Sequence, residues 1–242
     1  MRRMYADDGR ELAGIFQRAK AVGTVTSLDM AVPDPASAAG KADWRAVLHR
    51  ALPFVDLFLP SLDEIRYMVP RSDRTPDTPD PLHLSECTDV AQELLAMGPA
   101  VVALKLGENG LYVRTSPDPA RLTPLRLLCG DSLDSWRGRE LYCPAFRADV
   151  VGTTGCGDCA IAAFLAALLR SLPVEQAVTA AAAAGACAVE RADAVSGLVS
   201  WQALQDRITA GRRRDPLPLE APAWSPVAPD GTAHGPNDRS FR

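Results

Sequence analysis

The sequence predicts an α/β fold in which helices cover both faces of a largely parallel β-sheet. Short runs of β-branched and aromatic residues alternate along the chain with segments whose apolar residues recur at helical spacing. The run at 100–105 is apolar up to its final lysine, as expected of a strand that is buried on both faces. The alanine-rich segment 173–190 predicts a buried helix, and no internal repeat is visible.

The predicted elements alternate over most of the chain. Helices are expected at 7–21, 43–52, 61–69, 87–97, from the glycine-rich segment 152–157 to 170, at 173–190 and from 200 onward. Strands are expected at 24–29, 55–59, 100–105, 111–113 and 140–143. The glycines at 107 and 110 predict a turn that makes the fourth strand the hairpin partner of the third. Segment 71–81 holds three prolines and is expected to be a surface loop, and 116–138 shows no regular pattern.

Size and charge limit the class of protein. The chain has 242 residues, of which 47% are hydrophobic and 23% are charged, a composition that suits one globular domain with a tail. The net charge of −4 argues against a nucleic-acid partner, and the short basic run 212–214 is interpreted as a solvated linker. We expect the domain to span residues 1–210 and to be followed by a disordered, proline-rich tail over 211–242.

No segment of the sequence predicts a membrane span. The longest apolar run, 177–189, is shorter than the roughly 20 residues that a bilayer requires. Asp7, Asp8 and Glu11 stand where a signal peptide would have its apolar region. We therefore expect a cytoplasmic protein without a membrane partner.

The cysteines are scattered and do not have the spacing of a disulfide framework. Cys156 and Cys159 form a CxxC pair, but a zinc site needs further ligands, and the sequence offers neither a second pair nor a nearby histidine. A redox role of this pair remains an alternative.

The most informative segment is a glycine-rich turn that leads directly into a long apolar helix. Gly155 and Gly157 permit a sharp turn and a close approach of the backbone to a ligand. The free N–H groups of the first helical turn and the helix dipole then favour an anion. Asp158 lies at the same helix start. It is either an acidic residue that stabilises the helix or a general base for a hydroxyl that attacks phosphorus.

A dinucleotide site is the alternative interpretation of this turn. Gly155, Gly157 and Ala160 match the GxGxxG/A fingerprint of NAD- or FAD-dependent oxidoreductases, and Glu175 follows at about the required distance. Glu175, however, is expected at a helix start and not at the end of a strand, and Asp158 would place negative charge against a pyrophosphate. The sequence has no Walker A pattern, which excludes a P-loop NTPase.

Segment 151–169 resembles the second signature of the ribokinase-like (pfkB) carbohydrate kinases, in which D-T-x-G-A-G-D opens a long helix. Three further segments resemble elements of this family and occur in the family's order. They are 59–64 for the P-N-x-x-E element, 101–110 for the strand that ends in K-x-G-x-x-G, and 182–189 for the helix that lines the adenine pocket. The resemblance covers about residues 10–210 and implies a three-layer α/β/α ribokinase-like fold.

The resemblance also implies roles for the matching residues. Asp158 is similar to the catalytic base, and the anion hole would be formed by the backbone N–H groups of Gly155, Cys156 and Gly157. The nucleotide-binding residues would be Lys105, Gly107, Gly110 and Gly185. Glu64 would place Mg²⁺, through water. The implied reaction transfers the γ-phosphoryl group of ATP to a sugar or a sugar-like alcohol, with ATP and Mg²⁺ bound.

Two positions depart from the family pattern. Gly152 stands where the family has an aspartate linked to monovalent cation binding, so potassium activation is not predicted. Ser61 stands where the family has an asparagine, and it forms a capping-box pattern with Glu64. Glu64 is therefore either a helix-cap partner or a metal-site residue. Lys105 is likewise either a nucleotide contact or a charge at the solvated end of a strand.

The family's first signature, a Gly-Gly-x-x-x-Asn region that contacts the sugar, has no counterpart in residues 1–60. The resemblance therefore implies that the N-terminal part of the fold and its sugar-covering lid are missing. We expect incomplete catalysis and an exposed sheet edge that favours self-association. A non-catalytic nucleotide-binding remnant or regulatory module is the second functional hypothesis, and an oxidoreductase is the third.

Overall fold

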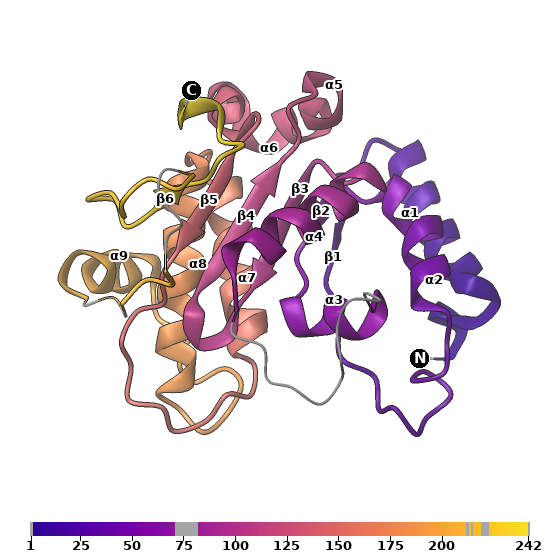
Figure 1. Ribbon diagram of the computed structural model, residues 1–242, viewed down its shortest axis with the longest axis horizontal. Helices are drawn as coiled ribbons and strands as arrows, with labels where there is room; N and C mark the ends of the chain where they lie inside the picture. The colour runs from indigo at the N-terminus through magenta and orange to yellow at the C-terminus, as the bar shows by residue number, and fades with distance from the viewer. Residues whose placement is uncertain (1, 71–81, 212, 214, 219–222, 242) are drawn as a thin grey trace.

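The computed structural model describes residues 2–70, 82–211, 213, 215–218 and 223–241. A six-stranded sheet in the order β1-β2-β3-β4-β5-β6 lies at the centre of these residues (Figure 1). Its strands are β1 (Ser27–Leu28), β2 (Leu57–Phe58), β3 (Val101–Lys105), β4 (Leu111–Thr115), β5 (Glu140–Cys143) and β6 (Ala233–His234). The loop predicted at 71–81 lies outside the described residues.

The sheet is mixed, which corrects the expectation of a largely parallel sheet. Strands β1, β2 and β3 run parallel, whereas β4, β5 and β6 are each antiparallel to the strand before them. Helices join the parallel strands, but only the short turn 107–110 joins β3 to β4. A connection of this length can form only an antiparallel pair, since a parallel one needs a crossover of a dozen or more residues.

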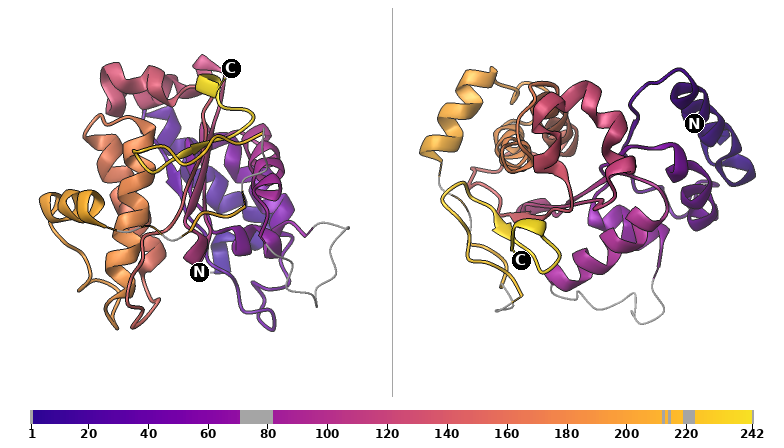
Figure 2. Two further views of the ribbon diagram at one scale, coloured as in Figure 1. Left: turned by 60° about the vertical axis from the view of Figure 1, so that its left-hand side comes forward. Right: turned by 90° about the horizontal axis from the view of Figure 1, so that it is seen from above.

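Helices cover both faces of the sheet, as predicted (Figure 2). Val101 and Ala103 of β3 pack into one core, and Val102 and Leu104 pack into the other, because successive side chains of a strand point to opposite faces. The first core contains residues of α7 (Cys156–Leu169), α8 (Val174–Val189) and α9 (Trp201–Ala210). The second contains residues of α2 (Trp44–Ala51), α3 (Leu62–Met68) and α4 (Leu84–Ala96), and α1 (Arg10–Ala21) packs against α2.

Side-chain caps set several helix starts. Asp43 accepts a hydrogen bond from the backbone N–H of Ala46 at 3.0 Å and begins α2, as the sequence predicts. Ser61 begins α3 through a complete capping box with Glu64. Ser200 caps α9 through the N–H of Ala203. These caps satisfy backbone groups that have no partner inside the helix.

The segment without a sequence pattern, 116–138, packs over the end of α7. It forms the short helices α5 (Pro119–Leu122) and α6 (Arg126–Cys129) and several 3₁₀ turns. Trp136 is fully buried, lies edge-on to Phe164 of α7, and donates a hydrogen bond to the carbonyl oxygen of Leu172 at 3.1 Å. The conformation of segment 116–138 depends on these contacts with residues distant in sequence, which explains why the segment shows no local periodicity.

The C-terminal part differs from the predicted disorder wherever the structure describes it. Strand β6 pairs with β5, and the buried ring of Trp224 lies close to Tyr112 and Tyr142. Asp238 is fully buried and accepts hydrogen bonds from the side chain of Arg139. The described residues of this segment are ordered by their contacts with the sheet, so the proline content did not predict their conformation. A domain boundary at residue 210 remains a prediction.

The alanine-rich run 177–189 forms most of α8, as predicted, and packs against α7. Over the ranges that the structure describes, no helix combines the length and the apolar character needed to cross a bilayer.

Candidate functional site

Helix α7 begins at a left-handed glycine without a side-chain cap. Gly155 has φ 76°, and a Cβ at this position would lie 2.7 Å from the Cα of Ala194, so only glycine fits. The N–H of Cys156 donates a long hydrogen bond of 3.3 Å to the carbonyl oxygen of Thr153. Asp158 is exposed in the first turn. The turn therefore has the backbone geometry of an anion site, with a carboxylate beside it.

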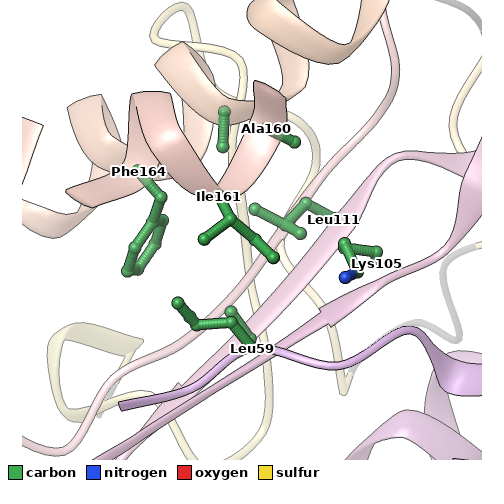
Figure 3. Close-up of a pocket in the computed structure, with 8 residues that line it drawn as sticks. Leu59, Lys105, Leu111, Ala160, Ile161 and Phe164 are labelled. Carbon is green, nitrogen blue, oxygen red and sulfur yellow. The ribbon is translucent and has the colours of Figure 1, made fainter. Parts of the chain in front are cut away.

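Lys105, at the end of β3, lies against this turn. Its Nζ is 2.7 Å from Oδ1 of Asp29, and a Cβ on Gly157 would lie 3.5 Å from its Cδ and 3.6 Å from its Nζ. The side chain is only 14% exposed. Figure 3 shows it at the edge of the apolar contact between α7 and the sheet, where Ile161 faces the strands. The aliphatic stem is thus packed while the ammonium group remains at the turn.

Two carboxylates accompany the ammonium group of Lys105. Asp29, directly after β1, forms the ion pair with it. Glu64, in the first turn of α3, accepts a hydrogen bond from the N–H of Ser61 at 2.6 Å, and Ser61 Oγ accepts one from the N–H of Glu64 at 3.2 Å. Burial raises the pKa of Glu64, while the hydrogen bond from Ser61 and the charge of Lys105 act in the opposite direction. The predicted capping box is confirmed.

Sequence reasoning placed Asp29 at the end of a strand but did not select it as a site residue. The signal was present, because ligands of open α/β sheets bind beyond the carboxyl ends of the parallel strands. Asp29 follows such a strand directly and lies on the same edge of the sheet as Lys105, which makes it a candidate site residue.

A cavity of about 370 Å³ opens beside the start of α7. All four predicted nucleotide-binding residues line it, together with two of the three predicted anion-hole residues, Cys156 and Gly157. The four are Lys105, Gly107, Gly110 and Gly185. Most of the remaining wall is apolar and is formed largely by small side chains of α7 and α8 and by Phe146. Apolar walls with a few polar groups at one end are typical of a small-molecule site.

The glycines at the cavity have different roles. Gly107 has φ 57°, and a Cβ there would meet no atom within 4 Å, so this residue leaves space open. Gly110, at φ 106°, packs so closely on the carbonyl oxygen of Cys143 that any side chain would collide with it. A Cβ added to Gly185 would lie 3.7 Å from the Cβ of Ala160 in α7. Gly107 and Gly185 therefore shape the cavity, whereas Gly110 holds the hairpin.

Gly155, Asp158 and Glu64 do not line this cavity. Asp158 follows Gly157 directly, so the carboxylate and the cavity share the first turn of α7. Glu64 is connected to the site through Lys105, whose N–H donates to the carbonyl oxygen of Pro60 and whose charge acts on the Glu64 carboxyl group.

The structure contradicts the dinucleotide interpretation. Glu175 lies in the first turn of α8, where its carboxylate forms an ion pair with the buried Arg139 at the start of β5. The glycine turn follows the loop after Phe146 and not the end of a strand. Glu175, the acidic residue that would bind a ribose in a dinucleotide site, therefore forms a structural ion pair instead.

Residues 7–201 match the family model of the pfkB family carbohydrate kinases. The chain belongs to the pfkB family of carbohydrate kinases. A search of curated proteins found no match. The family assignment agrees with the order of the motifs around Glu64, Lys105, Asp158 and Gly185.

Solved structures of ribokinase-type enzymes have a similar fold. A ribokinase II of E. coli in complex with ATP and Mg²⁺ is 21% identical, with a TM-score of 0.59 over 81% of this chain and 52% of that one. Aminoimidazole riboside kinase from Salmonella enterica is 22% identical, with a TM-score of 0.58 over 81% and 55%. Arabidopsis thaliana ribokinase, complexed with ribose and ATP, is 18% identical, with a TM-score of 0.58 over 82% and 52%.

These likenesses establish the three-layer ribokinase-like fold. At these identities they show the fold alone. The chain spans about half the length of the solved structures that it matches.

Proposed function

We propose that this chain binds ATP with Mg²⁺ and carries the phosphoryl-transfer centre of a kinase that acts on a sugar or a sugar-like alcohol. One observation carries the proposal: the cavity, Lys105 and the start of α7 with Asp158 meet at one place. Membership of the pfkB family supports it, as do relatives of the same fold that hold ATP.

In the proposed complex the adenine base occupies the apolar cavity and the phosphates lie toward Lys105 and Gly157. The N–H groups at Gly155, Cys156 and Gly157 form the anion hole for the transferred phosphoryl group. Asp158 accepts the proton of the acceptor hydroxyl as its oxygen attacks phosphorus. The exposure of Asp158 leaves it accessible to a second substrate.

The residues present fit a magnesium ion that is held mainly by the nucleotide. Among the described residues no group of three or more acidic, histidine or cysteine side chains forms a metal cage. Mg²⁺ is usually bound through one or two carboxylates together with phosphate oxygens and water. Glu64 and Asp29 are the carboxylates beside Lys105 that would hold it, and the ion would neutralise charge on the phosphates.

Calorimetry with the purified chain tests the proposal. Mg²⁺–ATP is expected to bind and NAD is not. Lys105→Met should weaken ATP binding, while Lys41→Met, which removes an exposed lysine, should not. If ATP fails to bind, or if NAD binds more tightly than ATP, the proposal is wrong.

A non-catalytic nucleotide-binding module is the second candidate, because the chain spans about half the length of the structures that it matches. ATP binding without ADP release for any sugar in a broad panel would favour it. Sugar-dependent ADP release would exclude it.

A further inference from the structure

The C-terminal segment, which here means the described residues among 213–241, contacts the wall of the nucleotide cavity. The family match ends at residue 201, so this segment lies beyond the part of the chain that the family model covers. It packs along β5 (Figure 1), where β6 pairs and Leu217 N–H donates to the hydroxyl of Tyr142 at 3.1 Å. Segment 145–150 follows β5 and contributes to the cavity wall.

Arg213 connects the C-terminal segment to segment 145–150 of the cavity wall. Its guanidinium carbon lies 4.2 Å from the centre of the Phe146 ring, a cation–π contact, and the backbones of the two residues form an isolated antiparallel bridge. Nη1 lies 3.0 Å from Sγ of Cys143 and donates to the carbonyl oxygen of Pro144 at 3.3 Å. Phe146 is almost fully buried and lines the cavity. Arg213 therefore braces the residues that lead into this wall.

A turn of the same segment holds the guanidinium in place. Nη2 of Arg213 donates to the carbonyl oxygen of Asp230 at 3.3 Å, and Thr179 Oγ1 of α8 donates to the same oxygen at 3.2 Å. Gly231 has φ 85°, and a Cβ there would collide with the guanidinium group. The missing side chain at Gly231 gives Arg213 its path to Phe146.

We propose that the C-terminal segment is part of the nucleotide site: Arg213 fixes Phe146 as the aromatic wall against which the purine base packs. The inference rests on the proposed function, since it takes the cavity to bind ATP. A base stacks favourably on an aromatic ring, and a ring that is held in place loses less freedom on binding. Arg213 is a positioning residue for the base and leaves the phosphate contacts untouched.

The test compares three probes by calorimetry: adenosine, ATP and inorganic tripolyphosphate, which has phosphates but no base. Arg213→Ala should weaken adenosine and ATP binding by roughly three- to tenfold and leave tripolyphosphate binding unchanged. Arg239→Ala is the matched control, because Arg239 lies in the same segment and pairs with the exposed Asp134. The control should bind all three probes like the wild type.

Gly231→Ala provides a second route to the same effect, since its methyl group would displace the guanidinium. It should weaken adenosine binding as Arg213→Ala does, and the double variant should be no weaker than Arg213→Ala alone. Unchanged adenosine binding by Arg213→Ala, or an equal loss for tripolyphosphate in a variant that melts at the wild-type temperature, would overturn the inference. If the wild type binds neither adenosine nor ATP, the proposed function fails with it.

Discussion

In the part of the chain that the structure describes, the exposed carboxylate of Asp158 forms no hydrogen bond or ion pair that would give it a structural role, and the general-base role that we propose leaves it free to take a proton. Asp158→Asn should lower kcat for sugar-dependent ADP release by at least about 10²-fold and leave ATP affinity nearly unchanged, because general-base catalysis is worth about 10²–10⁴-fold. Asp206→Asn, an exposed substitution in α9, is the control. Turnover near the wild-type rate in Asp158→Asn would remove the residue from catalysis.

The two glycines at the start of α7 have different structural roles. Gly155 holds the positive φ, whereas Gly157 lies inside α7 and faces Lys105. Gly155→Ala should therefore destabilise the fold by more than about 1 kcal/mol, through strain and a collision with Ala194. Gly157→Val should leave the turn intact and weaken triphosphate binding by crowding Lys105. Chemical denaturation and calorimetry separate these effects, and a Gly157→Val chain with wild-type ATP affinity would contradict the second.

At the scale of single residues, the sequence identified the residues that line the cavity but missed Asp29, a carboxylate that contacts Lys105. Lys105, Gly107 and Gly185, which the sequence motifs single out, all line the cavity. Asp29 was missed, because its importance depends on the parallel pairing that brings β1 beside β2 and β3. The sequence places Asp29 directly after a strand, but only the strand pairing shows that this strand end lies beside Lys105.

Among the elements, α3 has a start that one substitution can test. Ser61→Ala removes the acceptor of the Glu64 N–H and should cost about 0.5–2 kcal/mol of unfolding free energy, the usual value of an N-cap. It should also loosen the Glu64 carboxylate that the capping box holds. Ser85→Ala, an exposed serine inside α4, is expected to change stability less. Urea unfolding measures both, and equal small effects would show that the box contributes nothing.

Element types were predictable where a local period or cap exists. Asp43 and Ser61 begin their helices as predicted, and α8 is the buried helix that its alanines indicate. Strand direction was not predictable beyond the hairpin. Strand β5 is antiparallel to β4 although α5 and α6 lie between them, so the presence of helices does not fix the strand direction, and the expectation of a largely parallel sheet was wrong. The absence of potassium activation stays a prediction, which rests on Gly152 having no carboxylate where the family has an aspartate.

For the whole molecule, the C-terminal segment is expected to contribute substantially to stability. Arg139 and Asp238 form an ion pair in which the side chains are 4% and 0% exposed. Asp238→Ala leaves the buried guanidinium short of one partner and should lower the unfolding free energy by about 3–5 kcal/mol. Asp134→Ala breaks an exposed pair with Arg239 and should have no measurable effect. Thermal melting of the two variants checks this, and equal melting temperatures would contradict it.

The edge of the sheet at β1 is the basis of a prediction about assembly. In the part of the chain that the structure describes, β1 pairs only with β2, and Ser27 is exposed. Unpaired edge strands readily pair with another chain, so we expect concentration-dependent self-association. Light scattering of the purified chain measures it. Ser27→Pro, which removes an edge N–H, should reduce it, and a wild-type chain that stays monomeric at all concentrations would refute the expectation.

The sequence by itself determined the α/β class, several helix starts and the glycine turn before α7, because each depends on interactions between residues close in the chain. Hydrophobic periodicity, capping side chains and the glycine before α7 act over a few residues. The tertiary structure decided the antiparallel directions of β5 and β6, the ion pair of Asp29 with Lys105, and the packing of the C-terminal segment on β5. These depend on burial and pairing between segments far apart in sequence, and no local pattern records such contacts.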